Sequence, residues 1–143
     1  MARIMALDWG TKYIGVAVSD ELQISTRPLA PLTVTSPDAL LSEIQFLCKN
    51  FNILTIVIGL PLSLSREAGP QAQKVLEFAD AVEAKTGIEV VLWDETYTSQ
   101  AAEDSLKSSG KDVRKNRAEV NSIAAQHILE SYLSEHYAVS SKL

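Results

Sequence analysis

Residues 3–18 read RIMALDWGTKYIGVAV, and their pattern indicates two strands joined by a short turn. After Arg3, residues 4–7 form an apolar run typical of a buried strand, and residues 14–18 are rich in β-branched side chains. The segment between them, Asp8 to Tyr13, is short enough for a hairpin connection, and Gly10 is available there for an unusual backbone angle. We therefore expect an antiparallel pair of strands with Asp8 at the end of the first.

The rest of the chain adds one extended segment and then alternates helices with strands. Residues 27–34 contain Pro28 and Pro31, which confine an extended segment to a sheet edge. Ser36 and Pro37 form a helix start signal, and apolar residues follow at helical spacing. The later elements expected are a strand covered on both faces at 53–58, a helix from Pro70 to Gly87, a buried strand at 88–93, a helix at 98–110 and a final helix at 118–133.

This order, β-β-β-α-β-α-β-α-α, predicts an α/β fold with a mixed five-stranded sheet. Three strands linked by short turns form an antiparallel unit, helix crossovers add two parallel strands, and helices cover both faces. A chain of 143 residues fits one ordinary domain, and neither a repeat nor a long linker divides it. We therefore expect a single domain over residues 1–143.

The composition is that of a soluble globular protein, with 46% apolar and 22% charged residues. The longest apolar stretch is far short of the roughly 20 residues that a membrane helix needs, and the run before Asp8 is too short for a signal peptide. Cys48 is the single cysteine, which favours a reducing, cytoplasmic location. The net charge of −5 argues against broad attraction to nucleic acid but leaves room for local basic patches.

Acidic residues end two of the predicted buried strands, Asp8 the first and Asp94-Glu95 the last. Functional sites in open α/β sheets gather at strand ends, and side-chain alternation lets only one of Asp94 and Glu95 face the same side as Asp8. Two facing carboxylates favour a bound Mg²⁺, and a pair of such ions about 3.5–4 Å apart can activate water and stabilise the leaving oxygen of a phosphodiester. The alternative is that each acid is an ordinary solvated loop or turn residue.

Other polar residues are candidates for phosphate contacts. Thr11 can donate a hydrogen bond to a phosphate, and Asn121, one turn before Ala124-Ala125, either faces the crevice or bonds to nearby backbone. Basic residues before the final helix either form a solvated loop or bind a nucleic-acid backbone. With Lys12 and Arg66, these basic candidates are Lys111, Arg114, Lys115 and Arg117.

Five blocks of sequence, in this order and at these spacings, resemble the YqgF family, described as Holliday junction resolvases and as nucleases that process the small-subunit ribosomal RNA precursor. They are residues 6–20, 58–62, 69–72, 92–98 and 123–133. The resemblance implies a ribonuclease-H-like fold and an endonuclease dependent on a divalent metal, Mg²⁺ or Mn²⁺. Its implied substrate is structured RNA, in 5′ processing of the 16S ribosomal RNA precursor, or alternatively branched DNA, with the protein a monomer or weak homodimer.

The resemblance also implies the catalytic and metal-binding residues. The family has an acid after the first strand, a glutamate after the strand before the third helix, and an aspartate just before the Ala-Ala pair of the last helix. The corresponding residues are Asp8, Glu95 and Asn121, so the third acid is replaced by an amide. Thr96 also stands where the family usually has arginine. The alternative to an active nuclease is therefore a catalytically weakened member that still binds nucleic acid.

A third hypothesis is an actin-like ATPase, because Asp-x-Gly-Thr also occurs at nucleotide phosphates in that fold. Such enzymes hold the nucleotide between two domains, whereas 143 residues supply one.

Overall fold

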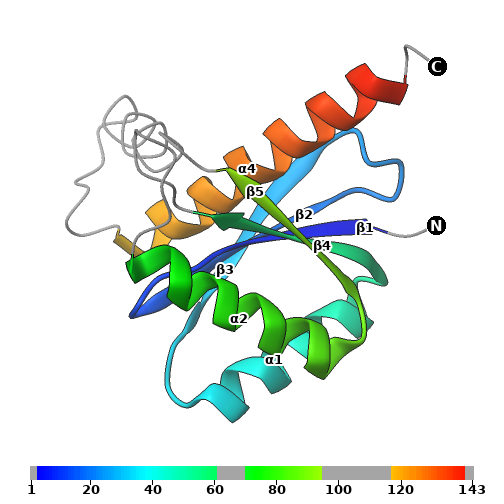
Figure 1. Cartoon of the computed structure of the whole chain (residues 1–143). Helices are drawn as coiled ribbons and strands as arrows, with labels where there is room; N and C mark the ends of the chain where they lie inside the picture. Colours follow the sequence, from blue (N-terminus) through cyan, green and yellow to red (C-terminus); the bar gives the residue numbers. More distant parts are fainter. Residues whose placement is uncertain (1–2, 61–69, 95–116, 141–143) are drawn as a thin grey trace.

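The computed structural model describes residues 3–60, 70–94 and 117–140 of the chain. Five strands form one mixed sheet in the order β3-β2-β1-β4-β5 (Figure 1). The β1–β2 and β2–β3 pairs are antiparallel, and the β1–β4 and β4–β5 pairs are parallel, as the sequence predicts. The strands are β1 Arg3–Asp8, β2 Tyr13–Ser19, β3 Thr26–Thr33, β4 Ile53–Leu60 and β5 Glu89–Asp94.

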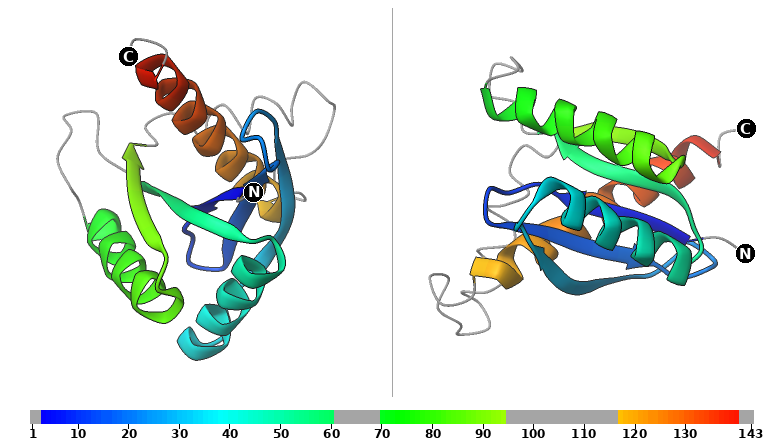
Figure 2. Two further views of the ribbon diagram at one scale, coloured as in Figure 1. Left: turned by 90° about the vertical axis from the view of Figure 1, so that its right-hand side faces the viewer. Right: turned by 90° about the horizontal axis from the view of Figure 1, so that it is seen from below.

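Helices cover both faces of this sheet, which confirms the predicted layers (Figure 2). Helices α1 (Pro37–Asn50) and α2 (Pro70–Thr86) pack on one face, and α4 (Arg117–Ser140) crosses the other. Helix α4 is longer than the helix expected at 118–133, and the helix expected at 98–110 lies outside the described residues. None of the described helices combines the length and apolar composition that a membrane-spanning segment requires.

Alternation along β1 divides the core into two parts. Met5 and Leu7 pack with α1 and α2, whereas Ile4 and Ala6 pack beneath α4, and all four are buried. Because successive side chains of a strand point to opposite faces, Asp8 continues the row formed by Ile4 and Ala6. The first strand therefore delivers a carboxylate to the α4 side of the sheet at the point where the strand ends.

The edge strands of the sheet are β3 and β5, and only β3 was expected at an edge. β3, with Pro28 and Pro31, is an edge strand, as expected. The prediction of a buried strand at 88–93 is wrong, because β5 is the other edge strand and its residues are half-buried or exposed, with Leu92 39% exposed. An apolar run does not reveal how many neighbours a strand has. Both neighbouring helices hold β5: Trp93 Nε1 donates to Ser131 Oγ of α4 at 3.1 Å, and the Val90 N–H donates to Glu83 Oε1 of α2 at 3.4 Å.

Local signals mark the helix ends as predicted. The Ser36 hydroxyl accepts a hydrogen bond from the Ala39 N–H at 3.2 Å, and Pro37 begins α1. Gly87 follows α2 with a φ of +71°, a conformation that glycine adopts without the strain of a side chain.

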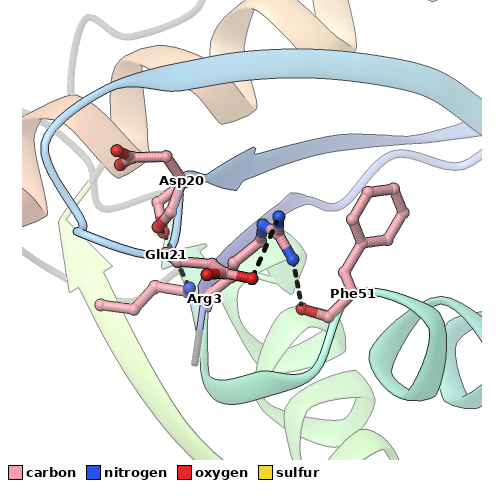
Figure 3. Close-up of polar contacts among 6 residues, drawn as sticks. Arg3, Asp20, Glu21 and Phe51 are labelled. Atoms are coloured by element: carbon pink, nitrogen blue, oxygen red, sulfur yellow. Dashed lines mark hydrogen bonds and ion pairs between the residues drawn. The ribbon is translucent and has the colours of Figure 1, made fainter. Parts of the chain in front are cut away.

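Polar contacts fix the end of the sheet opposite Asp8 (Figure 3). The Arg3 guanidinium donates to the Phe51 carbonyl at 3.3 Å and lies 3.7 Å from the Glu21 carboxylate. The Asp20 carboxylate accepts hydrogen bonds from the N–H groups of Ile24 and Ser25, and these bonds lower its pKa. This end of the sheet is therefore stabilised by local hydrogen bonds and an ion pair.

Cys48 lies on the buried face of α1, and we expect it to be unreactive in the folded protein. Burial raises the pKa of its thiol to about 11, so almost no thiolate is present near neutral pH. A chromogenic disulfide reagent should label Cys48 in denaturant and label the native protein much more slowly. Because the unfolded thiol ionises at lower pH than the folded one, the free energy of unfolding should also fall as the pH rises above about 9. Rapid labelling of the native protein would contradict this prediction.

Candidate functional site

A cleft of about 530 Å³ opens where β1 ends. It is lined by residues 8–13, which connect β1 to β2, by Pro70, Gln71 and Lys74 of α2, and by Asn121 of α4. The structure thus brings together four of the residues singled out from the sequence, namely Asp8, Thr11, Lys12 and Asn121. Three elements that lie far apart in the sequence contribute to this one site.

Among the described residues that line this cleft, Asp8 is the one acid. It is the last residue of β1, pairs with Gly15 of β2, and is only 5% exposed. Charge interactions are stronger where little water screens them, so a carboxylate in this position attracts a cation more strongly than one on the open surface. Its oxygens are ligands of the kind that Mg²⁺ prefers.

Asn121 reaches the cleft because α4 approaches β2 very closely. A Cβ atom at Gly15 would overlap the backbone carbonyl of Asn121, so only glycine permits this approach. Beside it, the buried Ser122 hydroxyl accepts a hydrogen bond from the Val16 N–H at 3.3 Å, next to a shift in the β2–β3 register. These two backbone-level contacts fix the position of α4 over the strand.

The Asn121 side chain also holds the connection between β1 and β2. Its Nδ2 donates a hydrogen bond to the Tyr13 carbonyl at 3.3 Å. The acceptor is thus a backbone carbonyl far away in the sequence. The alternative considered from the sequence was a bond to nearby backbone within the helix. Since Nδ2 is engaged, the amide oxygen Oδ1 is the atom of this side chain suited to accept a ligand.

Gly10 is needed in the β1–β2 connection because of close packing, not because of the unusual backbone angle that the sequence suggested. Among the described glycines only Gly87 has a positive φ, so Gly10 does not adopt the expected unusual angle. A Cβ atom at Gly10 would instead collide with the Tyr13 carbonyl, and would lie 3.6 Å from Asn121 Nδ2. Glycine is required here by the close approach of backbone atoms.

Lys74 and Gln71 of α2 also line the cleft, and neither was predicted from the sequence. The apolar spacing of α2 shows which face of the helix is buried, but it does not show which end of the helix lies near Asp8. Lys12 also lines the cleft, with its ammonium 5.7 Å from the centre of the Tyr13 ring. Two lysines from different elements therefore line the cleft together with Asp8.

The other candidate residues cannot be placed from this structure. Glu95, Arg66, Lys111, Arg114 and Lys115 lie outside the described residues, and Arg117 is placed only as the first residue of α4. Within the described ranges, no three histidine, cysteine, aspartate or glutamate residues gather as a metal site. Asp94 lines a different pocket, with Trp93, Ser131 and Glu135.

Comparison with known sequences identifies the family. A model of the RuvX family, described as Holliday junction resolvase, matches residues 2–135. A relative from Syntrophus aciditrophicus is 43% identical over 131 residues, which cover 92% of this chain and 87% of the relative. Another, from Desulforudis audaxviator, is 39% identical over 132 residues, which cover 92% and 94%. Both relatives carry the name "Putative pre-16S rRNA nuclease".

Solved structures show the same fold at low identity. T. thermophilus RuvC in complex with Holliday junction substrate has a TM-score of 0.62, with 14% identity and coverage of 96% of this chain and 97% of that one. Fowlpox virus resolvase with Holliday junction DNA has a TM-score of 0.59, with 13% identity and coverage of 93% and 97%. These likenesses confirm the predicted ribonuclease-H-like fold.

The family match confirms the resemblance to the YqgF family and the expected class of enzyme, an endonuclease that hydrolyses phosphodiester bonds. It favours this class over the actin-like ATPase. The match covers residues 2–135, which include β1, the whole cleft and most of α4. The chain belongs to the RuvX family of Holliday junction resolvases.

Proposed function

We propose that this chain is a metal-dependent endonuclease that cuts structured nucleic acid in the cleft around Asp8. The observation that carries the proposal is the convergence of Asp8, Asn121 and Lys12 in that cleft at the end of β1. The proposed substrate is the 16S ribosomal RNA precursor, because both relatives reported above are named for it. Such a substrate places the activity in the cytoplasm.

The proposed metal ligands are Asp8, Glu95 and Asn121. Asp8 and Asn121 line the cleft, whereas Asp94 lines a different pocket, which leaves Glu95 as the acid proposed from the family pattern. Carboxylate and amide oxygens form a donor set that suits Mg²⁺ or Mn²⁺. When bound, the metal supplies Lewis-acid activation of water and stabilises charge on the leaving oxygen.

The chain's own basic residues bind the substrate backbone in this proposal. Lys12 and Thr11 line the cleft, where an ammonium and a hydroxyl are suited to phosphate oxygens. The remaining proposed contacts come from Arg66, Lys111, Arg114, Lys115 and Arg117. Because the net charge is −5, binding depends on this local group of cations rather than on the overall field of the protein.

Cleavage assays on two substrates test the proposal. A 16S ribosomal RNA precursor and a four-way DNA junction are each incubated with the protein, with Mg²⁺ and with Mn²⁺. Cleavage of the RNA by the natural protein, lost in Glu95→Gln without loss of the fold, supports the proposal. Cutting of the junction alone makes branched DNA the substrate, and full activity in Glu95→Gln overturns the proposed ligand.

The amide at position 121 supports a second candidate function, a nucleic-acid-binding member with weakened catalysis. A carboxylate there would add one negative charge to the cleft beside Asp8, which strengthens attraction for a divalent cation. Salt-sensitive binding of RNA without metal-dependent cutting would identify this function.

We expect Asn121→Asp to lower the metal concentration needed for half-maximal cleavage. The variant also loses the donor to the Tyr13 carbonyl, which should decrease the free energy of unfolding by about 1–2 kcal/mol without metal. Metal titrations of cleavage and of thermal unfolding measure the two effects. Asn121→Ala is the control, since it loses the hydrogen bond and gains no charge. If Asn121→Asp and Asn121→Ala require equal metal concentrations, position 121 is not a ligand.

A further inference from the structure

The cleft has a second wall that the proposed chemistry does not use. This wall is the beginning of α2, where Pro70, Gln71 and Lys74 face the same space as Asp8. Lys74 is exposed, and it makes no ion pair with any residue in the described part of the chain. Glu77, one helical turn further along α2, does not pair with it either.

The charges around this wall favour an anion. Lys74 from α2 and Lys12 from the β1–β2 connection both line the cleft, and Asp8 is the single acid that lines it in the described structure. Helix α2 has no acidic residue in its first turn, so the positive end of its dipole adds to the field of the two lysines. Two lysines and one acid give the described lining a net positive charge, which favours binding of an anion.

We propose that Lys74 binds the phosphodiester backbone of the substrate, together with Lys12, so that the strand to be cut passes between α2 and the β1–β2 connection. The inference rests on the proposed function, because it takes the cleft as the place where the strand is held. A cleft of about 530 Å³ has room for a segment of backbone. Lysine contacts to phosphate give affinity and orientation without reading the base sequence.

Salt-dependent binding tests this role separately from cleavage. A fluorescein-labelled hairpin RNA and a labelled four-way DNA junction are titrated with the full chain in EDTA, from about 50 to 200 mM salt. Lys74→Gln should bind several-fold more weakly and lower the slope of log K against log salt by about 0.7–0.9, the value for one lost phosphate contact. Lys74→Arg, which keeps the charge, should retain most of the slope.

Lys85→Gln is the matched control, because Lys85 is an exposed lysine in the last turn of the same helix and does not line the cleft. Equal affinities and slopes for Lys74→Gln and Lys85→Gln overturn the inference, as does absence of binding to both probes. If the natural chain cuts neither probe in Mg²⁺ while Lys74→Gln still lowers the slope, the phosphate contact holds and the nuclease proposal fails. If the natural chain cuts and the two glutamine variants behave alike, the phosphate contact alone fails.

Discussion

Asp8→Asn is expected to abolish cleavage and leave the fold intact. The substitution keeps the size of the side chain and removes the negative charge that lines the cleft. Removal of one electrostatic contact to a transition state typically slows an enzyme by about 10²–10³-fold, and we expect at least this loss. Asn121 and Gln71 already supply amides, so this variant leaves three amides and no carboxylate among the described cleft residues.

Single-turnover cleavage with Mg²⁺ and with Mn²⁺ measures the effect, and thermal unfolding checks that the fold is retained. Asp80→Asn is the control, because Asp80 is an exposed acid on α2 that does not line the cleft. The Asp80→Asn variant has the same net charge as Asp8→Asn and should cut at the rate of the natural protein. A folded Asp8→Asn protein that cuts as fast as Asp80→Asn would show that the chemistry takes place elsewhere.

Gly15→Ala is expected to destabilise the protein strongly, by about 3 kcal/mol or more. The added methyl group would overlap the Asn121 carbonyl and press on the Ser122 N–H, and both are backbone groups that cannot rotate away. Overpacking usually costs about 1–3 kcal/mol, and here the helix itself must move. Helix α4 supplies Ala125, Ile128 and Leu129 to the core, so its displacement also exposes apolar surface.

Urea denaturation measures the loss, with Gly87→Ala as the comparison. A Cβ atom at Gly87 meets nothing within 4 Å. The strain of a positive φ alone should therefore lower the free energy of unfolding of that variant, by about 1 kcal/mol. The difference between the two variants isolates the contact between α4 and β2. Equal unfolding midpoints for the two would mean that α4 does not need this close approach.

Much of the fold follows from short-range patterns in the sequence. The apolar run before Asp8, the prolines of β3 and the Ser36-Pro37 signal each depend on neighbouring residues only, and each prediction is confirmed. The burial of β5 was predicted wrongly, because the number of neighbouring strands is a property of the whole sheet.

In the candidate site, too, local sequence patterns identified some residues and missed others. Asp8 and Asn121 were identified through their motifs, and the structure places both on the cleft. Lys74 and the contact of Gly15 with α4 were missed, because each depends on which elements meet in three dimensions. No local pattern distinguishes a glycine needed for helix contact from any other glycine in a strand.

The contact between Gly15 and Asn121 joins an early strand to the last described helix, and this has a consequence for synthesis on the ribosome. A chain emerges from its N-terminus onward, so β1 and β2 are available long before α4 has been translated. Until α4 docks, Asp8 is present without Asn121 beside it. If the proposed ligands are right, the nascent nuclease is silent while it is being made, and an interrupted translation product lacking α4 is missing one of the three proposed metal ligands.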